Sequence, residues 1–197
     1  MIKSLIKKTI SIIRHPIVSA ILLLNGSKDF VIGRGLQINR LHYFKVGRKV
    51  SIGNHARLLF VPEYGGEKCS PSLMIGNNVS IGNRFSALCA DKVIIEDNNL
   101  IASDVLITSE NHGTDPEASV SYADNPLNTA PVIIGKGCWI GEKVSIMPGV
   151  ELGERCIVAC NSVVTKSFPS GSMIAGAPAK LIKQYDSSKH EWIRVLD

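Results

Sequence analysis

An aliphatic residue recurs at every sixth position through IIGKGCWIGEKVSIMPGVELGERCIVACNSVVTK, the segment 133–166. Helices repeat about every 3.6 residues and strands every second residue, so neither element produces this spacing. Self-similarity at a fixed period is typical of a solenoid, in which each repeat adds one unit to a stack. The six aliphatic positions are Ile134, Ile140, Ile146, Leu152, Val158 and Val164.

Each hexad is expected to form one short strand and one corner. Side chains alternate along a strand, so the residue two before each aliphatic one also points inward. A small residue after the aliphatic one permits a sharp turn. Three hexads close a triangular coil, so residues 18 apart stack on one another. The predicted stacked pairs are Ile134 with Leu152, Ile140 with Val158 and Ile146 with Val164, and the second inward set is Cys138, Val144, Val150, Cys156 and Ser162.

The repeat extends toward the N-terminus and is interrupted twice. Earlier runs with the same alternation lie at 32–53 and 75–108, whereas 61–72 and 109–131 have no period and are expected to be loops. Long excursions from a compact domain are often functional. The sequence therefore predicts an all-β solenoid over 29–183. We expect a helical segment over 1–28 and a C-terminal helix or tail over 184–197 that leaves the coil after Pro178.

The positive charge of the chain is concentrated in its first 28 residues. This segment holds five of the 22 Lys and Arg residues and none of the 17 Asp and Glu residues, so the remaining 17 basic and 17 acidic residues balance. A nucleic-acid-binding face is therefore not expected. One helical side carries Ile2, Leu5, Ile6, Ile10 and Ile13, and the other carries Lys3, Lys7, Ser11 and Arg14.

Pro16 is expected to end or kink this helix. The apolar run 17–24 that follows is too short to span a bilayer, which requires about 20 apolar residues. A secretory signal peptide is disfavoured because Pro16 interrupts the apolar stretch and no small-x-small cleavage site follows. Two interpretations remain open: peripheral contact of residues 1–28 with an anionic membrane surface, or a helix that packs on the domain.

The five cysteines include no CxxC pair, which argues against a zinc ribbon or a disulfide framework. Cys138 and Cys156 lie 18 residues apart and are expected to stack as free thiols in a reducing cytosol. We expect no bound metal.

Three motifs, W-I-G at 139–141, V-V-T-K at 163–166 and G-A-P-A-K at 176–180, occur in register in the C-terminal half. This half resembles the hexapeptide-repeat acyltransferases, in particular the galactoside, maltose and polysaccharide or lipopolysaccharide O-acetyltransferases. The resemblance implies a left-handed parallel β-helix and a homotrimer with active sites between subunits. It also implies transfer of an acetyl group from acetyl-CoA to a hydroxyl of a sugar or polysaccharide precursor. Such an enzyme would act in the cytoplasm or at the inner face of the membrane.

The resemblance also assigns roles to individual residues. His112, in the excursion 109–131, matches the catalytic base, and an imidazole with a pKa of about 6.5 suits removal of a hydroxyl proton near neutral pH. The backbone N–H of Glu142 matches the donor to the thioester oxyanion, and no covalent enzyme intermediate is implied. The positions that match contacts to the cofactor are Trp139, Gly141 and Ala159 for the pantetheine arm, Thr165 and Lys166 for the phosphates, and Lys180 for the nucleotide end.

The sequence departs from these enzymes before the catalytic coil. Segment 84–97 is shorter than in the galactoside and maltose enzymes, and Leu88 stands where they have an asparagine. Together with the basic N-terminus, this favours an acceptor linked to a membrane lipid. The alternatives are N-acetylation of an amino sugar and a non-catalytic scaffold in glycan assembly. A zinc-dependent carbonic anhydrase of this shape would need three clustered histidines, and only His112 lies in a suitable region.

Overall fold

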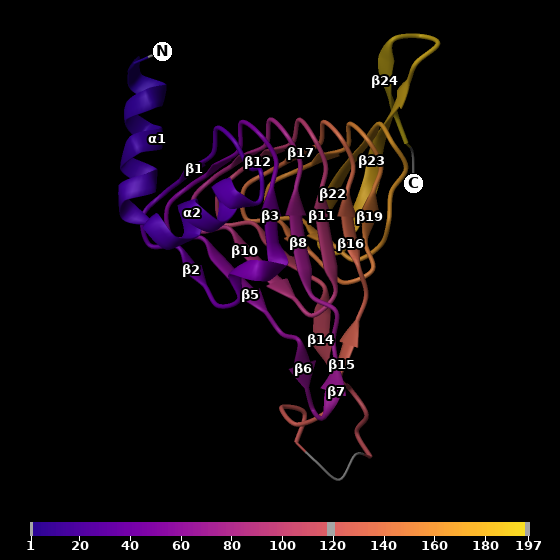
Figure 1. The fold of residues 1–197 in the computed structure, drawn as a ribbon. Coiled ribbons are helices and arrows are strands. Elements are labelled where there is room, and N and C mark those ends of the chain that lie inside the picture. The colour runs from indigo at the N-terminus through magenta and orange to yellow at the C-terminus, as the bar shows by residue number, and fades with distance from the viewer. Residues whose placement is uncertain (1, 118–120, 196–197) are drawn as a thin grey trace.

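Short strands on three parallel sheets, visited in rotation, form most of the molecule (Figure 1). The computed structural model describes residues 2–117 and 121–195, without the side chains of residues 2–5 and 7. Residues 118–120 of the expected loop therefore lie outside what is described, as do the side chains of Ile2, Lys3, Leu5 and Lys7 on the expected helix faces.

The first sheet contains β1 (Val31–Ile32), β4 (Ser51–Ile52), β9 (Ser80–Ile81), β12 (Leu100–Ile101), β17 (Trp139–Ile140), β20 (Ile157–Val158), β22 (Ser172–Gly176), β23 (Ala179–Asp186) and β24 (Glu191–Arg194). The second contains β2 (Gln37–Ile38), β5 (Arg57–Phe60), β10 (Ser86–Cys89), β13 (Leu106–Thr108), β18 (Ser145–Ile146) and β21 (Val163–Val164). The third contains β3 (Phe44–Val46), β8 (Ser72–Ile75), β11 (Lys92–Ile95), β16 (Val132–Ile134) and β19 (Glu151–Leu152). A 3₁₀ turn at Leu41–Tyr43 precedes β3.

The stacking predicted from the period is confirmed. Ile134 pairs with Leu152, Ile140 with Val158 and Ile146 with Val164, each in a parallel register. Both inward sets are buried, including the polar Ser162, which is fully buried. Because strand hydrogen bonds run between coils and the aliphatic side chains fill the interior, each coil is held by its neighbours.

The earlier coils are longer than predicted. Ile75 pairs with Ile95 and Ile81 with Ile101, which are 20 residues apart. Strands β10 and β11 have four residues each, twice the length of the two-residue strands β18 and β21. The extra residues widen the coil, and the buried Ala90 takes up the corner between β10 and β11.

Both interrupting segments contain strands. Residues 61–72 include the hairpin β6 (Glu63–Tyr64) and β7 (Glu67–Lys68), and 109–131 include β14 (Glu110–His112) paired with β15 (Leu127–Thr129). The two hairpins project together from one side of the coil as an arm (Figure 1). The prediction of loops without secondary structure is therefore wrong for the paired parts of both segments.

The helix expected at the C-terminus is also wrong. β23 pairs antiparallel with β22, and β24 pairs antiparallel with β23. This places the tail on the open edge of the first sheet, where it pairs with backbone groups of β22 that would otherwise have no strand partner.

At the other end, α1 (Ile2–Arg14) and α2 (Pro16–Leu24) lie beside the first coil (Figure 1). Pro16 begins α2, which confirms the predicted break. No helix in the described part of the chain is long and apolar enough to cross a membrane.

Candidate active site

His112 lies on the arm, at the end of β14 and opposite Leu127 of β15. Its side chain is exposed. The base of this hairpin is anchored by Ser109, which is fully buried and whose hydroxyl oxygen accepts the backbone N–H of Ala90 and of Asp91, at 3.2 and 3.0 Å. The carbonyl of Ser109 accepts the N–H of Ala130 at 3.1 Å, which closes the excursion where it returns to the coil. His112 is thus held on a paired strand rather than on a free loop.

The second hairpin of the arm supports the first through Tyr64. The Tyr64 ring meets the His112 ring edge-on, with centroids 5.3 Å apart and planes at 66°. The Tyr64 hydroxyl donates a hydrogen bond to the carbonyl of Ala123. A Cβ added at Gly65 would lie 2.9 Å from the nitrogen of Pro126, so the hairpin tip packs directly on the return segment of the excursion.

Tyr64 is not among the site residues predicted from the sequence. The available signal was Gly65-Gly66, because two glycines between short extended runs favour a tight hairpin turn with positive φ at both positions. Their φ angles are +57° and +81°. Nothing in the sequence indicates that this hairpin contacts a histidine 48 positions later.

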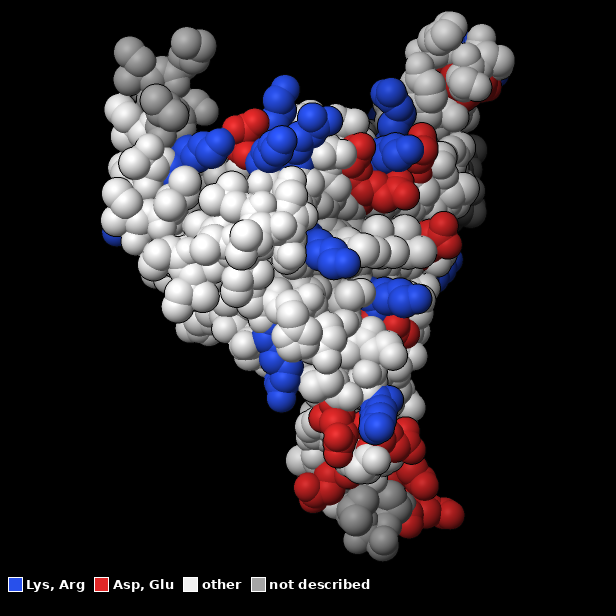
Figure 2. Space-filling model, in the orientation of Figure 1, with Lys and Arg blue, Asp and Glu red and all other residues white. Residues whose placement is uncertain are grey.

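A polar hollow of about 470 Å³ opens directly after His112, lined by Gly113, Thr114, Asp115, Asn125, Pro126 and Asn128. Asn125 is 5% exposed, and its amide donates to the carbonyl of Gly113 at 3.3 Å, which fixes one wall. Acidic side chains crowd the surface of the arm (Figure 2). The hollow therefore offers hydrogen-bonding groups in a negative field next to the imidazole.

A second set of the predicted residues gathers at the corner between the first and second sheets. A Cβ on Gly141 would lie 2.7 Å from the nitrogen of Cys160, next to Ala159 one coil further. The carbonyl of Glu142, whose side chain is exposed, accepts the N–H of Asn161 at 2.9 Å. Lys180 is exposed, and on β23 it pairs with Ala175 of β22. The residue before Ala175 is Ile174, whose carbonyl accepts the N–H of Ala159. The small size of Gly141 is thus already required by stacking of the coils, with or without a ligand.

Trp139 precedes this corner on β17 and is 52% exposed. It borders a groove of about 760 Å³ whose other walls include Arg155, Tyr185 and Trp192. Tyr185 and Trp192 stack edge-on at 5.4 Å across β23 and β24. These two aromatic residues are not among the predicted site residues, because the segment that carries them was expected to be a helix or tail that leaves the coil.

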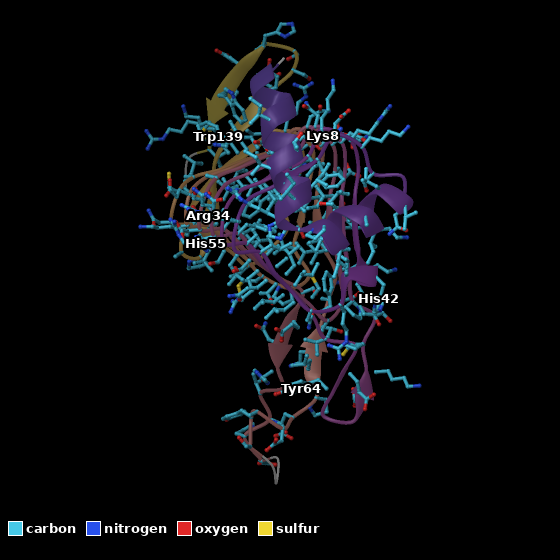
Figure 3. All side chains as sticks on the ribbon, turned by 60° about the vertical axis from the view of Figure 1, so that its left-hand side comes forward. Lys8, Arg34, His42, His55, Tyr64 and Trp139 are labelled. Atoms are coloured by element: carbon cyan, nitrogen blue, oxygen red, sulfur yellow. The ribbon has the colours of Figure 1, made fainter. Side chains whose placement is uncertain are left out.

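Thr165 and Lys166 are exposed at the next corner, between the second and third sheets. The Lys166 ammonium lies 5.6 Å from the centroid of the Phe168 ring. The arm with His112 leaves the coil at this same corner, after β13. The predicted residues therefore occupy two corners separated by one face, about 20 Å for six extended residues. In Figure 3, Trp139 lies on the coil and Tyr64 lies below it on the arm.

The remaining histidines and the cysteines occupy other environments. His42 and His55 are exposed, and the Nε2 atom of His15 lies 2.8 Å from the carbonyl oxygen of Gly33. All five cysteines are free, and burial raises the pKa of the Cys89 thiol to about 12. Among residues 2–117 and 121–195, no group of three or more His, Cys, Asp or Glu side chains is placed to hold a metal ion.

Residues 131–166 match the family model described as bacterial transferase hexapeptide (six repeats). Over 126 residues the chain is 36% identical to WbbJ of Escherichia coli (strain K12), which carries the provisional description lipopolysaccharide biosynthesis O-acetyl transferase. This match covers 61% of the chain and 64% of WbbJ. Galactoside O-acetyltransferase of the same organism is 32% identical over 126 residues, or 60% of the chain and 61% of that enzyme.

The chain thus spans slightly less than two thirds of the length of these curated relatives. Among solved structures, AntD, an N-acyltransferase from Bacillus cereus crystallised with dTDP and 3-hydroxybutyryl-CoA, superposes with a TM-score of 0.69. The superposition covers 87% of the chain and 90% of AntD at 18% identity, so it supports the fold alone. The chain carries the hexapeptide repeat and resembles the acetyltransferases built on it.

Proposed function

We propose that the protein is an acetyl-CoA-dependent acetyltransferase that modifies a hydroxyl of a sugar or polysaccharide precursor. The coil is taken to be a left-handed parallel β-helix that assembles as a homotrimer. The observation that carries the proposal is the placement of His112, Thr165 and Lys166 at one corner and of Trp139, Gly141, Ala159 and Lys180 at the next. Threefold assembly of triangular coils brings different corners of neighbouring copies together, and so completes one site from two chains.

The chemistry requires few groups from the protein. His112 removes the proton of the acceptor hydroxyl as its oxygen attacks the thioester carbonyl. The resulting oxyanion is stabilised by the Glu142 N–H. When the intermediate collapses, the C–S bond breaks and the CoA thiolate takes the proton from the imidazolium. Products are the acetyl ester and CoA–SH, with no covalent enzyme intermediate and no metal.

The exposed residues suit the donor. Trp139 presents an aromatic wall for the pantetheine arm beside a groove large enough for part of a cofactor. Lys166 and Lys180 present ammonium groups that can pair with phosphates. The five free thiols support action in a reducing cytoplasm.

The proposal is tested by measuring the release of free thiol from acetyl-CoA with a panel of sugar, lipid-linked glycan and amino-sugar acceptors. His112→Ala is expected to lower kcat by about 10²–10⁴, whereas His42→Ala, also an exposed histidine, serves as the matched control. Equal loss in both variants, or none in either, would remove His112 from the reaction. Turnover only with an amino sugar would correct the acceptor from a hydroxyl to an amine.

A further inference from the structure

Helix α1 docks on the coil through its polar side. Ser11 is 1% exposed, and its hydroxyl oxygen accepts the N–H of Ile32 at 2.8 Å. The His15 ring contacts the Gly33 carbonyl on the same side, and the Lys8 ammonium pairs with Asp29 at 2.6 Å. In Figure 3 this helix crosses the front of the coil with Lys8 at its edge. The amphipathic helix is therefore oriented opposite to the usual arrangement, in which the apolar side faces the core.

The apolar side of the two helices consequently faces outward. We call this surface the apolar cap face; it comprises Ile6, Ile10 and Ile13 of α1 and Ile17, Leu23 and Leu24 of α2, which are 51, 40, 71, 73, 45 and 85% exposed. Leu22, in contrast, is fully buried and ties α2 to the core. Figure 2 shows an uncharged surface over α2. Six large exposed aliphatic side chains on two consecutive helices are of the kind that marks an interaction surface.

The charges near the apolar cap face indicate which kind of partner it binds. Residues 1–28 carry five basic and no acidic side chains. Arg14 and Lys28 are exposed, while Asp29, the first acidic residue, is already paired with Lys8. A second copy docked through the same face would bring two positive segments together. A surface of anionic lipid would instead accept the aliphatic side chains and attract the cations.

We propose that α1 and α2 lie in the plane of an anionic lipid surface, with the apolar cap face inserted below the headgroups. Neither helix is long enough to cross a bilayer, so the contact is peripheral. The polar anchoring by Ser11 and His15 presents this face without local unfolding. The inference is independent of the chemistry proposed for the arm.

The test is flotation of the full chain with lipid vesicles. Vesicles of phosphatidylcholine with about 30% phosphatidylglycerol are compared with pure phosphatidylcholine, at low and high salt. Wild-type protein should float with the anionic vesicles and lose most of this binding in high salt or on neutral vesicles. The double variant Ile13→Glu/Ile17→Glu should bind at least about tenfold less.

The matched control is Ile182→Glu/Ile193→Glu, which makes the same changes at positions 37% exposed on β23 and β24. It should float like wild type, and circular dichroism should show that both variants fold. Absence of wild-type flotation, or equal flotation of both double variants, would overturn the proposal. A third outcome would also overturn the proposal: the wild type does not bind vesicles, and the Ile13→Glu/Ile17→Glu variant has a lower oligomer mass than wild type. The apolar cap face would then join copies of the chain.

Discussion

At the scale of single residues, the arm is organised around the contact between Tyr64 and His112. Tyr64 fixes the imidazole by ring contact and fixes the return segment through the carbonyl of Ala123. A histidine on a two-stranded arm would otherwise sample several rotamers. The second hairpin therefore positions the group that we propose as the base.

Replacing Tyr64 separates these two roles. Tyr64→Ala is expected to lower kcat about two- to tenfold because an aromatic pair contributes roughly 0.5–1.5 kcal/mol. Tyr64→Phe retains the ring and should lose less. Steady-state kinetics should show an unchanged KM for acetyl-CoA, since Tyr64 is not among the residues proposed to contact the cofactor. An equal loss in Tyr64→Phe and Tyr64→Ala would contradict this, because it would show that the hydroxyl, and not the ring, is what matters.

Some contacts could be predicted from the sequence and others could not, and particular residues show why. The pairs Ile134–Leu152 and Ile140–Val158 followed from the period because each hexad repeats the same local geometry. Tyr64 could not be found in this way, because its contacts with residues 112 and 123 join two non-periodic segments. The position of Tyr64 depends on tertiary packing between these two segments, which no local sequence pattern encodes.

At the scale of the elements, Asn99 ties two successive coils together at the corner between the third and first sheets. It is 2% exposed; its amide donates to the carbonyls of Glu96 and Gly135 at 2.8 and 3.0 Å, and its oxygen accepts the N–H of Cys138 at 2.7 Å. This one side chain joins the coil before the excursion at 109–131 to the coil after it, in addition to the backbone pairing between them.

Asn99→Ala is expected to lower the free energy of unfolding by about 2–4 kcal/mol, because buried groups at Gly135 and Cys138 lose their partners. Asn77→Ala, at an exposed corner where the side chain accepts the Arg48 N–H, should cost less. Chemical denaturation of both variants measures the difference. Equal losses would mean that burial does not amplify the cost.

The attachment of α1 should depend on acidity through Asp29. A hydrogen bond from Lys8, together with its charge, lowers the pKa of Asp29 below 3.8. A lowered folded-state pKa adds stability above 3.8 that is lost as pH falls through the folded value. Asp29→Asn is suited to this test because asparagine tolerates the positive φ of 58° at this position. The unfolding difference between wild type and Asp29→Asn should be present at neutral pH and vanish in strong acid; a difference that grows in acid would contradict the assignment.

The orientation of α1 illustrates a limit of pattern reading at this scale. The sequence correctly separated an apolar from a polar side of the helix. It could not show which side meets the coil, because docking depends on Ser11 and His15 meeting the backbone of Ile32 and Gly33. Similarly, the tail forms β23 and not the expected helix, because the open edge of β22 offers hydrogen-bond partners for its backbone groups.

At the scale of the whole molecule, the two groups of proposed site residues lie on different corners of one coil. Under the proposed homotrimer, each chain would contribute one corner to each of two sites rather than forming one complete site alone. The proposed cofactor residues belong to both corners, so the assembled protein should bind acetyl-CoA before any acceptor is known.

Titration calorimetry with acetyl-CoA tests this central claim most directly. We predict micromolar binding, about −8 kcal/mol, that weakens about tenfold in Lys166→Ala through loss of a phosphate contact. Lys136→Ala, an exposed lysine at the third corner, should bind like wild type. No detectable binding by a folded trimer would contradict the account, and it would leave the coil as a scaffold or an enzyme with a different donor.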